Sequence, residues 1–233
     1  MSTLFDGKYM FSCIPKILEA LPLTLYMLLL VMIIGLLLGF LLAALRLCKN
    51  KIGNAIAAVY VSFARGTPEL VQLFLIYYMV PGILDGLGID TSDWSKVVFA
   101  VIAFSMSNAA YLSETLRSAY LAVPKGQHEA AASVGMTGMQ AFRRVVLPQA
   151  VAVALPNVGN SIVIMFKTLS IGFSIGVTEI LGKTKLISAA GFGAKNLECY
   201  VAAAIIYCVV CFIMERTLHF LERMFQRGKK QYA

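Results

Sequence analysis

The residues Gly182-Lys183-Thr184 have the types that end a phosphate-binding loop, so a nucleotide site is the first chemistry to test. That motif places a glycine five residues before its second glycine, in a loop that joins a strand to a helix. Position 177 is valine, and Gly176 lies one residue too far back. No apolar strand precedes the segment, so we expect no ATP binding by this chain.

Other reactive side chains are scattered. The histidines, His128 and His219, have no neighbouring ligand pattern, and the adjacent Glu198 and Cys199 give no geometry for a nucleophile and its base. The pair Cys208-x-x-Cys211 has half the spacing of a metal or redox site, but nothing supplies further ligands, and buried cysteine is a common small apolar residue. We therefore expect no catalytic residue and no metal site.

The composition is that of a membrane protein. Of the 233 residues, 59% are apolar and 14% are charged, and the mean hydropathy is +0.79, whereas soluble domains carry about 25% charged residues. A helix needs about 20 apolar residues to cross a bilayer. The sequence predicts an all-α membrane protein with one domain, residues 1–233. Its five expected spans are 21–45, 55–80, 96–120, 149–167 and 200–221, and Pro68 is expected to disturb the helix of the second span.

The basic residues indicate the orientation, because lysine and arginine concentrate on the cytoplasmic side of a membrane protein. Five spans place the two termini on opposite faces. With the N-terminus outside and the C-terminus cytoplasmic, thirteen of the 20 basic residues face inward: Arg46, Lys49, Lys51, Arg65, Arg117, Lys125, Arg143, Arg144, Arg216, Arg223, Arg227, Lys229 and Lys230. Most of the +8 charge then faces the anionic inner leaflet and cytoplasmic partners rather than nucleic acid.

Ionisable and polar side chains within the spans are candidates for a pathway, because they are costly at membrane depth. The ionisable ones are Arg65, Glu69, Glu114, Lys167 and Glu179. Arg65 and Lys167 could instead snorkel to an interface, and Glu114 could form a local ion pair with Arg117, three residues on. The neutral candidates, which either join helices or meet a solute, are Gln72, Asn108 and Tyr111. Gly35-x-x-x-Gly39 predicts a close-packing helix face.

A polar segment, residues 124–148, separates the third and fourth spans. Residues 129–134 predict a short alanine-rich helix, and Gly135 allows a sharp turn after it. A second short helix, from about residue 139 to 146, is expected to stop at Pro148. Small alanines allow a partner surface close approach, although an ordinary solvated loop is the alternative.

The spacing in this segment resembles the signature loop of the membrane subunits of bacterial ABC importers. It reads Glu129-Ala130-Ala131, three residues, Gly135, nine residues, then an aliphatic residue, any residue and Leu147-Pro148. The chain also contains further motifs of the same family, in the family's order. They are Leu21-Pro22-Leu23-Thr24-Leu25, Arg65-Gly66-Thr67-Pro68-Glu69-Leu70-Val71-Gln72, Ala110-Tyr111-Leu112-Ser113-Glu114-Thr115-Leu116-Arg117 and Ile175-Gly176-Val177-Thr178-Glu179. From about Ile14 to Arg223, the chain resembles type I ABC importer permeases of the polar-amino-acid subfamily.

This resemblance implies a permease subunit of an importer in the bacterial plasma (inner) membrane. Its partners would be a cytoplasmic ABC ATPase dimer that holds ATP and Mg, a second permease copy or homologue, an extracytoplasmic substrate-binding protein and membrane lipid. The chain itself would bind no cofactor. The resemblance assigns ATPase coupling to Glu129, Ala130, Ala131, Gly135, Arg143 and Arg144.

One departure from the family concerns the position after Lys167. The family carries Asp or Asn there, in a neighbourhood that faces the translocation cavity, whereas this chain has Thr168. Loss of the carboxylate disfavours a cationic solute and leaves a neutral or polar amino acid, with cystine among the possibilities. The expected pathway residues are Gln72, Asn108, Tyr111, Glu114, Lys167, Thr168 and Ser170.

Two other classes of protein were weighed. A self-sufficient secondary transporter or channel would be expected to show a repeated half or an array of proton-relay residues, and neither is visible in the sequence. An intramembrane enzyme lacks a catalytic constellation. We expect no enzymatic activity from this chain, with ATP hydrolysis on a partner subunit.

Overall fold

The computed structural model describes residues 5–48 and 50–227. Every regular element within these residues is a helix. Of the basic residues used for the orientation, Lys49, Lys229 and Lys230 lie outside the described residues. The elements in chain order are α1 (Gly7–Leu18), α2 (Leu21–Leu47), α3 (Lys51–Gly66), α4 (Glu69–Gly86), α5 (Lys96–Leu121), α6 (Lys125–Ser133), α7 (Gly138–Ala141), η1 (Phe142–Val146), α8 (Leu147–Thr168), η2 (Leu169–Ile175), α9 (Ile180–Ala190) and α10 (Asn196–Arg227).

Five helical segments are long and apolar enough to cross a membrane, which confirms the expected number. They are α2, α4, α5, the continuous helical stretch Gly138–Ile175 and the segment Asn196–Met224 of α10. The predicted second span, 55–80, was wrong as one helix. The chain is extended at Thr67 and Pro68, so α3 ends at Gly66 and α4 begins at Glu69. Proline disfavours helical backbone in the residue before it, which explains this division.

The second short helix of the polar segment was also predicted to end too early. The chain remains helical through Pro148, which lies in the first turn of α8. The residues before it, Phe142–Val146, form a π-helix, whose wider turn leaves room for the proline ring. As a result, α7, η1, α8 and η2 follow one another without a loop.

Helix α5 forms the centre of the bundle, because 67% of its apolar window is buried. It packs closely on α2, where glycines replace larger side chains. A Cβ atom added at Gly35 would lie 2.8 Å from Asn108 Nδ2, and one added at Gly39 would lie 3.0 Å from Leu112 Cβ. This contact confirms the predicted close-packing face on α2.

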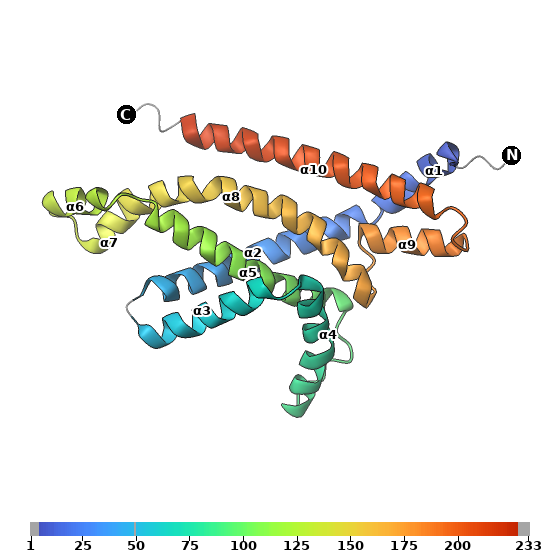
Figure 1. Cartoon of the computed structure of the whole chain (residues 1–233), viewed down its shortest axis with the longest axis horizontal. Coiled ribbons are helices and arrows are strands. Elements are labelled where there is room, and N and C mark those ends of the chain that lie inside the picture. Colours follow the sequence, from blue (N-terminus) through green and yellow to red (C-terminus); the bar gives the residue numbers. More distant parts are fainter. Residues whose placement is uncertain (1–4, 49, 228–233) are drawn as a thin grey trace.

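The bundle has two distinct ends (Figure 1). Helices α6 and α7 lie at one end, where the last described turns of α10 also lie. Helices α1 and α9 lie at the other end, and α4 projects away from the bundle axis. The N-terminal helix and the polar segment 124–148 are therefore at opposite ends of the molecule.

Candidate coupling surface and solute pathway

The α6–α7 helix pair is shaped by local sequence signals. Pro124 stands immediately before α6, where a proline starts a helix without losing a hydrogen bond. Gly135 adopts a φ of +79°, in the left-handed region that favours glycine. The Gly135 N–H donates to the Ala132 carbonyl at 3.0 Å, and the Met136 N–H donates to the Ala131 carbonyl at 3.1 Å. These bonds close the end of α6 and turn the chain towards α7.

Helix α7 has its own N-terminal cap. The Gln140 N–H donates to Thr137 Oγ1 at 3.4 Å, and the Thr137 N–H donates to Gln140 Oε1 at 2.9 Å. This reciprocal pair satisfies two backbone donors that a helix start otherwise leaves free. Both short helices of the pair are therefore terminated by specific hydrogen bonds.

A small apolar cluster attaches the pair to the long helices. Val123, Val146 and Ala150 are buried together, and Tyr120 and Phe142 pack against them. These residues come from α5, η1 and α8 or from their ends. A displacement of the α6–α7 pair would therefore also move α5 and α8.

The opposite face of the pair is exposed. Glu129, Ala130, Gly135, Arg143 and Arg144, all predicted coupling residues, lie on the surface. The sixth predicted coupling residue, Ala131, is buried, so its side chain holds α6 against the body.

Two further coupling candidates on this surface were not predicted from the sequence. Val134 is 71% exposed and Met139 is 65% exposed, on either side of the Gly135 turn. Large apolar side chains with this exposure at the tip of a polar loop are typical of a protein contact. Their position beside a turn glycine was the signal in the sequence.

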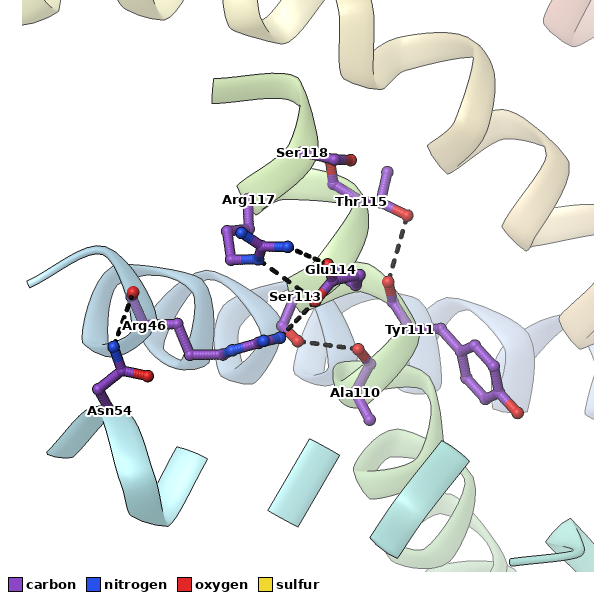
Figure 2. A network of polar contacts seen from close by, with 9 residues as sticks. All are labelled: Arg46, Asn54, Ala110, Tyr111, Ser113, Glu114, Thr115, Arg117 and Ser118. Carbon is purple, nitrogen blue, oxygen red and sulfur yellow. Dashed lines mark hydrogen bonds and ion pairs between the residues drawn. The ribbon is translucent and has the colours of Figure 1, made fainter. Parts of the chain in front are cut away.

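Glu114, a predicted pathway residue, lies in an ion-pair network (Figure 2). In the predicted topology, this network lies in the cytoplasmic half of the membrane. The Glu114 carboxylate accepts hydrogen bonds from Arg46 of α2 and from Arg117 of α5. The network lies beside a cleft of about 410 Å³ that is also lined by Arg65. The local Glu114–Arg117 pair, left open as the alternative, is therefore present and is extended by Arg46.

Two other predicted pathway residues hold helices together. Gln72 Nε2 donates to the carbonyls of Ala64 at 2.7 Å and Thr67 at 2.8 Å, and so bridges the break between α3 and α4. Asn108 Nδ2 lies 3.3 Å from Met32 Sδ, on the packed face between α5 and α2. Both amides are buried and engaged with neighbouring helices. These contacts match the first of the two roles considered above for neutral polar groups, which is to join helices.

Three elements meet at Glu69, the first residue of α4. Ser107 Oγ of α5 lies 3.5 Å from Glu69 Oε1, and the Thr168 hydroxyl at the end of α8 lies beside the same carboxylate. Thr168 was a predicted pathway residue, whereas Glu69 was noted as ionisable but not included in the site. Its position directly after Pro68 was the available signal, because an acidic residue is favoured in the first turn of a helix.

The remaining predicted pathway residues do not join this group. Lys167 is exposed, and Ser170 is half-buried in η2. Tyr111 is also exposed, and its ring centre lies 5.9 Å from Arg65 Cζ. The structure thus brings Thr168 together with Glu69 and Ser107, and places the other predicted residues in packing or surface contacts.

The segment Gly182-Lys183-Thr184, tested above as a phosphate loop, has a structural role in α9. Glu179 is fully buried and accepts hydrogen bonds from the backbone N–H groups of Leu181 at 2.8 Å and Gly182 at 2.7 Å. Its Oε2 also accepts from the Tyr207 hydroxyl at 3.1 Å. The backbone N–H groups of Leu181 and Gly182, which a phosphate loop would present to a phosphate, therefore already donate to the Glu179 carboxylate.

Comparison with known proteins agrees with this architecture. The family described as "Binding-protein-dependent transport system inner membrane component" matches residues 35–227. The chain is 40% identical to the L-cystine transport system permease protein TcyL of Bacillus subtilis (strain 168), over 98% of this chain and 95% of that protein. It is 32% identical to the glutamine transport system permease protein GlnP of Escherichia coli (strain K12), over 94% and 97% of the two chains.

A solved structure shares the fold. A chain of an amino acid ABC transporter crystallised with histidines superposes with a TM-score of 0.84 at 32% identity, covering 95% of this chain and 100% of that chain. The arrangement is that of type I ABC importer permeases. The chain belongs to the family of inner membrane components of binding-protein-dependent transport systems.

Proposed function

We propose that this chain forms half of the translocation pathway of an ATP-driven amino acid importer and receives its driving force through the α6–α7 helix pair. The single observation that carries the proposal is the construction of that pair. Val134 and Met139 are exposed at its tip, while Val146 and Ala150 anchor its base to the long helices. A surface of this kind can bind a partner and transmit the partner's movement.

The partners follow from the family. A cytoplasmic ABC ATPase dimer would hold ATP and Mg, a second permease copy or homologue would complete the pathway, and an extracytoplasmic binding protein would deliver the solute. The distribution of arginine supports a cytoplasmic position for the helix pair in a bacterial inner membrane, since Arg143 and Arg144 are both exposed on it.

The solute is proposed to be a neutral or polar amino acid, with cystine among the candidates. Similarity to permeases named for L-cystine and glutamine supports this class. Within the chain, the Glu69 carboxylate could bind a solute ammonium group, and the neutral Thr168 beside it adds no second negative charge. A single carboxylate suits a zwitterion better than a cationic side chain.

Reconstitution tests both parts of the proposal. In proteoliposomes that contain the ATPase subunit and the binding protein, uptake of radiolabelled amino acid should require ATP, and the ATPase subunit should co-purify with the solubilised chain. Uptake driven by an ion gradient without that subunit would favour the alternative, a self-sufficient secondary transporter.

The solute class is tested by competition. Thr168→Asp is expected to shift competition about tenfold towards cationic amino acids, because a second carboxylate would stand beside Glu69. Thr168→Ser keeps the hydroxyl and serves as the matched control. An unchanged competition profile for Thr168→Asp would remove this position from the pathway.

A further inference from the structure

Two thiols meet where the N-terminal helix crosses the start of the last helix. Cys13 of α1 and Cys199 of α10 are 186 residues apart in sequence, and their Sγ atoms are 3.7 Å apart. Cys13 is 1% exposed and Cys199 is 0% exposed. The two sulfur atoms are thus in direct contact between two different helices, in a place shielded from solvent.

Polar contacts at the start of α1 hold the same junction, about two helical turns before Cys13. The Asp6 N–H donates to Glu198 Oε1 at 3.0 Å, and Lys195 Nζ lies 3.1 Å from Asp6 Oδ2. Beyond the thiols, Ile17 is fully buried in the main core. Contacts on both sides therefore keep Cys13 facing Cys199.

The junction lies at the end of the bundle opposite α6 and α7 (Figure 1). If the helix pair faces the cytoplasm, as proposed above, the thiol pair faces the extracytoplasmic side. Disulfides form and persist in that compartment, whereas cytosolic thiols are kept reduced. This part of the inference rests on the proposed orientation, and the experiment below measures that orientation separately.

We propose that Cys13 and Cys199 form a disulfide bond that fastens α1 to α10. The oxidant is an extracytoplasmic disulfide, which reacts by thiol–disulfide exchange. One protein thiolate attacks a sulfur of the external disulfide, forms a mixed disulfide and releases one thiolate. The second protein thiolate then attacks the protein sulfur of that mixed disulfide and releases the other thiolate. Two protein thiols are oxidised, one external disulfide is reduced to two thiols, and the two protons pass to the released thiolates.

The geometry needs only a small adjustment. A disulfide has its sulfur atoms about 2.05 Å apart, so the two atoms must approach each other by less than about 2 Å. Because both thiols are buried, the exchange takes place while α1 is lifted from α10 or before it has docked. Once α1 is docked, burial protects the bond from reduction.

The other cysteines provide internal controls. Cys48 and Cys208 are exposed, and Cys211 lies one turn after Cys208 on α10. Within the described residues, Cys13 and Cys199 form the thiol–thiol contact, and these three do not take part in one. The proposal therefore predicts three free thiols and one bonded pair among the five cysteines.

The experiment counts thiols in the full chain within its complex. Cells are quenched with N-ethylmaleimide, the complex is purified and denatured, and thiols released by dithiothreitol are labelled with a maleimide–polyethylene glycol. Two added labels are expected in the native chain and in Cys208→Ser, and none in Cys13→Ser or Cys199→Ser. Peptide mass spectrometry should identify the Cys13–Cys199 link before reduction.

The opposite results are equally defined. A native chain in which dithiothreitol releases no thiols overturns the proposal, even if copper phenanthroline can form the disulfide in isolated membranes. Orientation is read from Cys48, which should resist a membrane-impermeant maleimide in intact cells. Labelling of Cys48 from outside would overturn the proposed orientation and function, whereas a protected Cys48 with no reducible pair would overturn the disulfide alone.

Discussion

Two turns in this molecule use the same backbone device in different surroundings. Gly135, between α6 and α7, has a φ of +79°, and Gly176, between η2 and α9, has a φ of +85°. A Cβ atom at Gly135 would meet nothing within 4 Å, whereas one at Gly176 would lie 2.7 Å from Lys96 Nζ. The first turn presents its helices to the outside, and the second inserts a helix into the bundle.

The acidic residues of the two regions show the same contrast. Glu129 is exposed on α6, but Glu179 is fully buried and accepts three hydrogen bonds at the start of α9. A family motif can therefore carry an acidic residue on the surface or within the internal structure. The surroundings of each acidic residue decide between these two placements.

The largest effect is expected from Glu179→Ala. This change leaves two backbone donors and the Tyr207 hydroxyl without their buried acceptor, which we expect to lower the free energy of unfolding by about 3 kcal/mol. Glu129→Ala is the control and should cost less than about 0.5 kcal/mol, because the side chain is exposed. Thermal unfolding of the detergent-solubilised chain measures both. Equal losses would abolish the distinction between the two regions.

A change at the exposed turn should affect docking instead of stability. Val134→Asp puts a charge where we expect an apolar contact, and should reduce co-purification of the ATPase subunit and ATP-dependent uptake at least about tenfold. Leu87→Asp, at another exposed apolar position, should leave both unchanged. Normal uptake by Val134→Asp would remove the helix-pair tip from the docking surface. Membrane insertion, followed by fractionation, should be normal for both variants.

The turn itself can be tested without adding charge. Gly135→Ala is expected to cost about 1 kcal/mol, since a Cβ atom disfavours the left-handed conformation. Gly135→Asn should cost less, because asparagine tolerates that conformation. Gly138→Ala, three residues later with no positive φ, is the matched control. Similar unfolding midpoints for all three variants would show that the backbone at residue 135 is not restrained.

The smallest effect concerns pH at the other end of the bundle. The Tyr9 N–H and the Lys195 ammonium group hold the pKa of Asp6 below its ordinary value of 3.8. Because the folded pKa is the lower one, this contribution is present above the unfolded pKa and is lost as the pH falls through the folded pKa. Hydrogen exchange of α1 should therefore increase below about pH 4 relative to α6. Asp6→Asn should remove this difference.

Local features of the fold were predictable from the sequence. The apolar runs predicted five spans, and the glycine after an alanine-rich segment predicted the turn at residue 135. Both signals arise within one turn or one helix. The division at Pro68 was misjudged because the apolar composition continues on both sides of it, although the proline itself indicated a disturbed helix.

Contacts between distant segments were not predictable. Arg46 binds Glu114 from 68 residues away. Glu69 meets Thr168 only because α4 and α8 each pack against α5. No periodicity or motif in the sequence specifies such pairs. Gln72 shows the same limit, since its hydrogen bonds to Ala64 and Thr67 depend on the angle between α3 and α4.

The helical stretch from Gly138 to Ile175 contains no loop, so it is a continuous mechanical link between its two ends. Its 38 residues, at about 1.5 Å each, have a contour length of more than about 50 Å, compared with the roughly 30 Å of bilayer hydrocarbon. Thr168 lies near the Ile175 end of this stretch, so a displacement at the α7 end, which we propose as part of the docking surface, would be carried along one continuous helical backbone to the residues proposed for the solute pathway.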